Sequence, residues 1–509
     1  MADEVASVSV VEEPLREAVL AGRFFGARSA PAIERTADFL ARDGRLLSVW
    51  FGPLEAARLA TKPEALRGAL DRDIAAIDRL IGVQLDAVLH HPRLQALEGR
   101  WRGLAWLISG IDPASRAKVK VLAITWSEFC RDLERAAEFD QSHLFRKIYE
   151  EEFGSPGGEP YGLLMVDQEV RHRPVAGHPT DDVSAMGQFA AVAAAAFAPT
   201  VISASPALFG VDHFGELAGV ADPAAPFSDV EHLRWRGLGQ ADDMRFISVT
   251  LPRLLARPPW GDDPARSDGF RYAEYAPVEE DRVWMSAGYG FAAAVVRSFV
   301  AFGWPSDVRG AEPDQEVGGL VDELPVEPFR TDPPGVAVPP PLDLVLTDHQ
   351  ERMLVEAGLM PLTAIPHGTE AVFGAVRSLQ SPARYIGTNA NAANANAQLS
   401  AQVNAMLSVS RFAHYIKMLG RNMVGSIRTA EEIERALQSW LTNYVNRNTS
   451  AGPETRARYP LASGRVMVRE RPGRPGVFGC TIHLQPQFQL DDVAATFRLV
   501  TDLVAPGAR

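Results

Sequence analysis

The sequence is poor in cysteine and contains no long apolar run. Only Cys130 and Cys480 occur among 509 residues, too few for a disulfide framework, so we predict two buried thiols in a reducing compartment. The longest apolar run, Phe189 to Pro199, falls well short of the ~20 residues that a membrane helix needs. The amino terminus, MADEVASVSVVEEP, lacks the basic start and apolar stretch of a signal peptide. We therefore expect a cytoplasmic protein without membrane insertion.

An excess of positive charge is also missing. The formal net charge is −13, which gives no general electrostatic support for binding nucleic acid. Hydrophobic residues make up 46% and charged residues 23% of the chain, close to the averages of globular proteins. The composition therefore excludes a wholly disordered chain and predicts a substantial core.

Catalytic motifs are absent or poorly placed. The sequence has no P-loop, no G-x-S-x-G elbow and no H-E-x-x-H motif. The stretch Gly288 to Ala293 fits the loose spacing G-x-G-x-x-A of dinucleotide-binding folds. A doubtful strand, Asp281 to Ala287, precedes it and no convincing ribose-binding acid stands at the proper distance, so we interpret the small residues as sites of close helix packing. An NAD-type oxidoreductase is the alternative from a different class.

The histidines do not have the spacing of metal ligands. His90 and His91 are adjacent, so on a helix their side chains point about 100° apart and cannot share a metal; beside Pro92 they indicate a helix end. His172 and His178 flank a loop that we interpret as solvated. We expect no catalytic residue, no cofactor and no metal.

The acidic run from Glu150 to Glu152 precedes an expected helix end at Gly154. Acids at a helix carboxyl end are unfavourable with the helix dipole. The run therefore predicts a cationic partner, either within the chain or across an interface.

Apolar periodicity predicts layers of sheet and helix. Apolar residues recur every three or four positions from Leu66 to Val88, which predicts a long helix. From there to about 320, β-branched runs alternate with helical segments, as in an α/β domain. Strands are expected at 119–125, 162–166, 200–204 and 246–251, and helices at 127–138 and 187–197.

Proline divides the chain. Prolines are dense over 325–341, where they break helices and strands. We divide the chain into an amino-terminal strand and linker region (1–64), a first α/β domain (65–324), the proline-rich connector (325–341) and a carboxy-terminal domain (342–509). In the last we predict a helix over 399–423, a second helix starting at Thr429 with a capping box to Glu432, and strands from Gly464 onward.

Long runs of the sequence resemble a known family. They are HPRLQALEGRWRGLAWLI (91–108), EFDQSHLFRKIYEEEFGSPGGEPYGLLMVDQEV (138–170), LFGVDHFGEL (208–217), RFISVTLPRLLARPPWG (245–261), EVGGLVDELP (316–325), SRFAHYIKMLGRNMVGS (410–426) and LQPQFQLDDVAATFRLVTDL (484–503). In this order, and spread over about 80 to 504, they are similar to the large sheath subunit of type VI secretion systems.

The resemblance implies a mixed α/β sheath-protein fold, with layered sheet-and-helix domains and extended terminal strands for β-exchange between subunits. It implies a structural role: pairing with a small sheath subunit, and polymerising with other copies as a six-start helical sheath. The sheath would stand on a baseplate around an inner tube of hexameric rings and contract to propel tube and spike for effector delivery. A recycling unfoldase ATPase is implied as a further partner, through the small subunit. A non-contractile tail-sheath-like scaffold is another alternative.

The amino terminus carries a β-prone stretch with Val5, Val8 and Val10 but no local strand partner. We predict that Glu4 to Val11 is donated to a neighbouring subunit and that residues 12–64 include a hinge. The predicted receiver includes the strand Arg465 to Glu470.

Two further segments are predicted contacts. Val466 and Val468 belong to the predicted receiver strand. The inner tube must be held and then released, so its contact is expected to be small and polar. The helix with Arg411 and Arg421 is the candidate, and core packing is its alternative.

Overall fold

The computed structural model describes residues 14–23, 34, 37, 41, 46–155, 157–267, 269–311, 318–327, 340–365, 368–386, 390–424, 429–448, 451–470, 478–487 and 497–503. The chain forms two compact units. The first comprises residues 1–95 and 259–282, and the second comprises residues 96–258 and 283–509.

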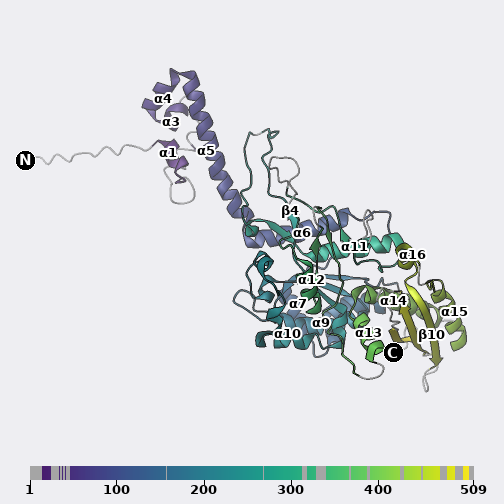
Figure 1. Cartoon of the computed structure of the whole chain (residues 1–509). Coiled ribbons are helices and arrows are strands. Elements are labelled where there is room, and N and C mark those ends of the chain that lie inside the picture. The colour runs from purple at the N-terminus through teal and green to yellow at the C-terminus, as the bar shows by residue number, and fades with distance from the viewer. Residues whose placement is uncertain are drawn as a thin grey trace, which may run out of the picture. The chain divides into compact units, whose positions relative to one another are not determined.

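The first unit is built on one long helix. Its helices are α1 (Leu15–Leu20), α3 (Leu46–Phe51), α4 (Pro53–Ala60) and α5 (Pro63–Leu89), and Figure 1 shows the three short ones at one end of α5. Asp73 of α5, 3% exposed, accepts hydrogen bonds from Arg16 Nε at 2.7 Å and Trp50 Nε1 at 2.9 Å. A buried carboxylate needs such partners, so Asp73 fastens α1 and α3 to α5.

The long helix predicted from Leu66 to Val88 is confirmed. Pro63 stands in the first turn of this helix, where a backbone N–H has no partner within the helix, so the missing N–H of proline costs nothing. His90 is its carboxyl cap and α6 (Pro92–Ser109) begins two residues later. The interpretation of His90 and His91 as a helix end is therefore confirmed.

A four-stranded parallel sheet organises the second unit. Its order is β1-β2-β3-β7, formed by β1 (Leu164–Val170), β2 (Thr200–Ala204), β3 (Ile247–Leu251) and β7 (Met360–Pro361). β2 and β3 are buried at every position, as expected for apolar strands covered on both faces. The strands predicted at 162–166, 200–204 and 246–251 are confirmed, with β1 extending four residues further.

Helices cover both faces of this sheet. Successive side chains of a strand point to opposite faces, and Ile202 enters one core cluster while Val201 enters another. The first cluster includes residues of α7 (Trp126–Arg135) and α9 (Asp182–Ala196), and the second includes residues of α6 and α11 (Ala287–Phe302). Cys130 of α7 is a buried free thiol, as predicted.

The prediction of a strand at 119–125 is wrong. These residues are extended, but they join no sheet among the described residues.

The connector lies largely outside the described residues, which resume at residue 340. On its two sides, Val321 and Leu342 enter the same core cluster. The domain boundaries stay a prediction.

The carboxy-terminal region adds a second layer of sheet and helix. β10 (Leu461–Glu470), β11 (Phe478–Pro486) and β12 (Phe497–Leu503) form an antiparallel sheet in that order, with Val466 opposite Ile482. We call it the terminal sheet. The helix predicted over 399–423 is divided into α13 (Ala390–Ser400) and α14 (Val403–Val424), and the capping box at Thr429 opens α15 (Ala430–Thr442) as predicted. α14 and α15 share a core cluster with the sheet, which includes the buried Cys480.

The fold is thus mixed α/β with several small sheets. The remaining helices are η2 (Phe139–Gln141), α8 (His143–Phe145), η3 (Arg146–Gly154), η4 (Pro206–Phe209), η5 (Phe214–Gly219), η6 (Ala225–Ser228), η7 (Val230–His232), α10 (Leu233–Leu238), η8 (Asp242–Phe246), η9 (Glu279–Asp281), α12 (Asp348–Glu356) and α16 (Pro453–Arg458). The remaining strands are β4 (Leu254–Arg257), β5 (Val283–Met285), β6 (Leu320–Val321), β8 (Thr363–Ala364) and β9 (Ala371–Val372).

Candidate assembly interface

Two cavities lie among the described residues, and neither has the features of a catalytic site. One, of about 10 Å³, is apolar and lies between α7, α9 and the parallel sheet. The other, of about 360 Å³, is a surface depression lined by charged residues that include Glu128 and Asp132. Glu128 caps α7, and Asp132 accepts hydrogen bonds from the backbone of His143 and Leu144. These two carboxylates therefore serve the fold.

The dinucleotide-like motif is a packing feature. Gly288 and Gly290 lie inside α11 and are buried. A Cβ at Gly290 would lie 3.1 Å from a methyl of Val321 and 3.3 Å from one of Leu254. The interpretation as close helix packing is confirmed.

The histidine loop is exposed over residues 173–179, His178 included, as predicted, but His172 differs from the expectation. His172 was predicted to be solvated, but it is buried and stacks on His232 with ring centroids 4.0 Å apart. Burial lowers the pKa of His172, which favours the neutral ring. Within the described ranges, no three His, Cys, Asp or Glu side chains converge as metal ligands.

The strand β10 presents an edge that side chains occupy. Along one side it pairs with β11. Along the other, Val466 N–H donates to Gln438 Oε1 at 2.9 Å, Gln438 Nε2 donates to the Gly464 carbonyl at 3.0 Å, and Val468 N–H donates to Glu434 Oε2 at 2.8 Å. We call the backbone groups of residues 464–468 on this side the β10 edge. Gln438 and Glu434 of α15 thus fill hydrogen-bonding positions that a neighbouring strand would otherwise use.

In the predicted receiver residues, the side chains and the backbone N–H groups face different surroundings. The side chains of Val466 and Val468 are buried in the cluster beneath the sheet, while their N–H groups face the β10 edge. The predicted donor residues Val5, Val8 and Val10 lie outside the described residues.

The two arginines of α14 have partners inside the chain. Arg411 stacks over Tyr415, 4.6 Å from the ring centroid. Arg421 donates to the carbonyls of Phe153 at 2.7 Å and Ser155 at 2.8 Å. Both contacts agree with core packing as the role of this helix, and a contact with an inner tube stays a prediction.

The acidic run finds its cations within the chain. Lys120 pairs with Glu152, and Lys147 pairs with Glu151 at 2.8 Å. Arg421, described above, binds the carbonyls at the same helix end, where a positive charge is favourable. Of the two possibilities that the sequence left open, the intramolecular partner is therefore found.

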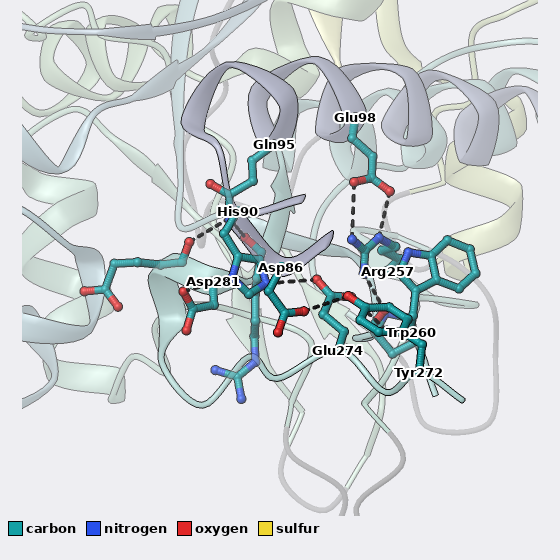
Figure 2. Close-up of polar contacts among 12 residues, drawn as sticks. Asp86, His90, Gln95, Glu98, Arg257, Trp260, Tyr272, Glu274 and Asp281 are labelled. Atoms are coloured by element: carbon teal, nitrogen blue, oxygen red, sulfur yellow. Dashed lines mark hydrogen bonds and ion pairs between the residues drawn. The ribbon is translucent and has the colours of Figure 1, made fainter. Parts of the chain in front are cut away.

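In the first unit, polar contacts fasten the loop 259–282 to the end of α5 (Figure 2). Tyr272 Oη donates to Asp86 Oδ1 at 2.7 Å, and His90 Nε2 lies 3.2 Å from Glu274 Oε1. Glu274 also accepts from Trp260 N–H at 2.8 Å. No local pattern predicts this cluster, because the contacts that tie the loop to α5 join residues 184 and 186 positions apart along the chain.

In the second unit, Figure 2 also shows an ion pair between Arg257, which is buried, and Glu98, which is half-buried. Arg257 Nε donates to Glu98 Oε1 at 2.7 Å, and Arg102 Nε donates to the same oxygen at 2.7 Å. The two guanidinium groups outweigh the cost of burial and lower the pKa of Glu98. This pair holds α6 against β4.

Apolar side chains remain exposed on several elements. The exposed aliphatic residues of α5 include Leu70, Ile74, Ile81 and Val88, which lie on the apolar stripe that predicted the helix. No described helix is long and apolar enough to cross a bilayer. Such apolar surface is typical of proteins that bury it against other chains.

Two family models match most of the chain. Residues 71–380 match the EvpB/VC_A0108 tail sheath N-terminal domain, and residues 392–503 match the EvpB/VC_A0108 tail sheath gpW/gp25-like domain. The chain is therefore a tail-sheath protein, a structural subunit and not an enzyme.

The secretion system follows from a relative. The chain is 35% identical over 440 residues to the type VI secretion system sheath protein TssC1 of Pseudomonas aeruginosa, and the match covers 86% of each chain. The chain belongs to this family of large type VI secretion sheath subunits. Among solved structures, the cryo-EM structure of the anti-feeding prophage baseplate matches with a TM-score of 0.33 and 11% identity, over 72% of this chain and 76% of that one. That likeness adds nothing to the assignment.

Proposed function

We propose that the chain pairs with a small sheath subunit in the cytoplasm and stacks with copies of itself in helical layers on a baseplate. The layers surround an inner tube, and their contraction propels the tube and its spike. An unfoldase ATPase recycles the contracted sheath through the small subunit. The family assignment supports this proposal, as does the apolar surface of α5, which a solitary chain exposes to water.

The β10 edge carries the proposal about how subunits are linked. An incoming strand offers carbonyls and N–H groups in a regular row. Among the described residues, the side chains of Gln438 and Glu434 meet the groups of residues 464–468 on that side. Both acceptors belong to one helix face and are able to turn away on their side-chain torsions. In the lone chain these side chains cover the edge. When they turn away, the edge is available for strand addition.

The strand that we assign to this edge is Glu4 to Val11 of a neighbouring copy. Backbone hydrogen bonds of an added strand would hold neighbours together while residues 12–64 pivot. Such links survive a large rearrangement because the strand moves with its receiver. Contraction therefore needs no dissociation of subunits.

The energy of contraction is modest per subunit. Coupled two-state changes in proteins typically involve about 1–3 kcal/mol. If each subunit gains an amount of this order and all move together, a sheath of many copies releases a large total without nucleotide at the moment of firing. Cooperativity between subunits is the requirement, and strand exchange supplies it.

Deletion of residues 1–11 tests the proposal. Co-expressed with the small sheath subunit, this variant is expected to form heterodimers but no long sheaths in negative-stain electron microscopy. Substituting Val5, Val8 and Val10 by lysine should have the same effect, because lysine opposes strand pairing at an edge.

The matched control replaces the same three valines by isoleucine, which keeps the β-propensity and should keep sheath length. Normal, contractile sheaths from the deletion variant would overturn the strand exchange. Wild-type tubes that occur in only one lattice form would favour the non-contractile scaffold.

A further inference from the structure

The first helix, α1, is short, and its helical form depends on docking. It comprises six residues, and an isolated helix of that length is not stable in water. Leu15 and Ala18 are 1% and 2% exposed, and they pack with Val49 and Trp50 of α3 in a small core cluster. Two buried side chains make a limited contact, so little apolar surface holds α1 to the first unit.

An ion pair adds to this contact. Arg16 of α1 donates twice to Asp73 of α5, from Nε at 2.7 Å and from Nη2 at 2.8 Å. Burial alone would raise the pKa of Asp73, but the hydrogen bonds from Arg16 and Trp50 lower it below its ordinary value. The Arg16 side chain is 37% exposed, so it is able to turn into water, and Trp50 then keeps its own hydrogen bond to Asp73. The pair therefore fastens α1 reversibly.

The helices α3 and α4 have a core that does not include α1. Phe51 of α3, with Ala56 and Leu59 of α4, forms a separate cluster with Ala69 of α5. The packing of α3 and α4 on α5 thus rests on other side chains than the packing of α1. Release of α1 therefore leaves the other two helices in place.

Docked α1 shortens the reach of the segment assigned to strand donation. Glu4 to Val11 joins α1 through Glu12, Glu13 and Pro14 only. A fully extended chain advances at most ~3.6 Å per residue, so Val11 lies within about 14 Å of Leu15. A strand on so short a tether cannot follow a neighbouring copy that slides by more than this distance.

Release of α1 lengthens the tether. Since α3 begins at Leu46, residues 12–45 would then join the donated strand to the packed part of the unit. Even as a continuous helix, at ~1.5 Å per residue, they would span about 50 Å. The whole of α5, with 27 residues, is about 40 Å long by the same measure. The released strand would thus reach beyond the unit that carries it.

We propose that α1 is a latch. Docked on α5 through Arg16 and Asp73, it keeps the amino-terminal segment close to its own chain before assembly, and it detaches when that segment pairs with a neighbouring copy. The backbone hydrogen bonds of the donated strand form only in the detached state, so pairing shifts the equilibrium toward detachment. This inference rests on the proposed function, in which Glu4 to Val11 is donated.

Hydrogen exchange of the full chain, co-expressed with the small sheath subunit, tests the latch. Ultracentrifugation separates assembled sheaths from free heterodimers. The backbone amides of α1 should exchange at least tenfold faster in the sheaths than in the heterodimers, because only docking protects so short a helix. The amides of α4 should differ less than twofold, which controls for damage to the unit.

Two substitutions release the latch from opposite sides. Arg16→Gln changes α1 and Asp73→Asn changes α5, and each removes one charge of the pair. In free heterodimers, each should raise the exchange rate of the α1 amides at least tenfold, and light scattering should show at least threefold faster sheath assembly. The matched control Asp71→Asn removes the same charge at an exposed position of α5 and should behave as wild type. If Asp73→Asn also deprotects α4, the half-exposed Arg16→Gln decides alone.

Equal protection of α1 in sheaths and in heterodimers overturns the latch while the strand donation stands. Unprotected α1 in free wild-type heterodimers, or latch variants that assemble at the wild-type rate, overturn it in the same way. Normal contractile sheaths from the chain that lacks residues 1–11 overturn the strand donation, and the latch together with it.

Discussion

At the scale of single residues, buried titratable groups make the fold sensitive to acid. His414 of α14 is fully buried; its Nε2–H donates to the Ala196 carbonyl at 2.9 Å. Burial lowers the pKa of His414 to about 4. The folded chain therefore keeps this ring neutral at pH values where the unfolded chain, with a histidine pKa of about 6.5, binds a proton.

The sign of the pH dependence follows. The contribution of a neutral buried histidine is complete above pH ~6.5 and is lost as the pH falls toward the folded pKa. As the pH falls from 6.5 to 5.0, the unfolded chain binds a proton at His414 and the folded chain does not. The free energy of unfolding should therefore fall by about 2 kcal/mol. Urea unfolding of the co-purified heterodimer, followed by tryptophan fluorescence at these two pH values, measures the loss.

The variant His414→Gln keeps an N–H donor without a titrating ring, so its loss between the two pH values should be smaller than that of the wild type by this amount. His349→Gln, at an exposed position, controls for the loss of an imidazole. An equal loss of unfolding free energy in the wild type and in His414→Gln would contradict the assignment of this acid sensitivity to His414.

At the scale of elements, two helical glycines differ in their surroundings. A Cβ at Gly68 of α5 would have Arg72 Nη1 as its nearest neighbour, at 3.7 Å, whereas one at Gly99 of α6 would lie 2.1 Å from the Trp284 carbonyl oxygen. Helix propensity favours alanine over glycine by about 1 kcal/mol in both places. Only at Gly99 does backbone occupy the space that an added Cβ would need.

The expected results therefore have opposite signs. Gly68→Ala should raise the free energy of unfolding by about 0.5–1 kcal/mol. Gly99→Ala should lower it by about 1–3 kcal/mol, the cost of overpacking. Urea unfolding of the two variants, each serving as the other's control, checks this, and shifts in the same direction would refute the close approach of α6 and β5.

Element prediction worked where the pattern was local. The capping box of α15 and the apolar strands β2 and β3 needed no knowledge of distant residues, because hydrogen bonds at a helix start and burial on both faces leave marks in adjacent positions. The prediction of a strand at 119–125 followed the same rule, but no strand in the described part of the chain pairs with it. Strand propensity is expressed as pairing only where a neighbouring edge exists.

At the scale of the whole molecule, the exposed apolar side chains of α5 and of Val119–Ile124 predict poor solubility of the lone chain. Expressed alone, it should precipitate or elute as aggregates in size-exclusion chromatography. Co-expression with the small sheath subunit should return most of it to the soluble fraction, because permanent partners bury such surface. A monodisperse monomer at micromolar concentration would contradict this expectation.

The sequence by itself determined the family, the absence of catalytic motifs and the existence of the longer elements, because each depends on the order of neighbouring residues. Only the tertiary structure decided which groups meet across the chain: His172 on His232, Arg421 on the carbonyls near Glu152, and Gln438 and Glu434 on the β10 edge. These pairs form because folding brings distant segments within hydrogen-bonding distance, and no local pattern encodes which distant segment arrives.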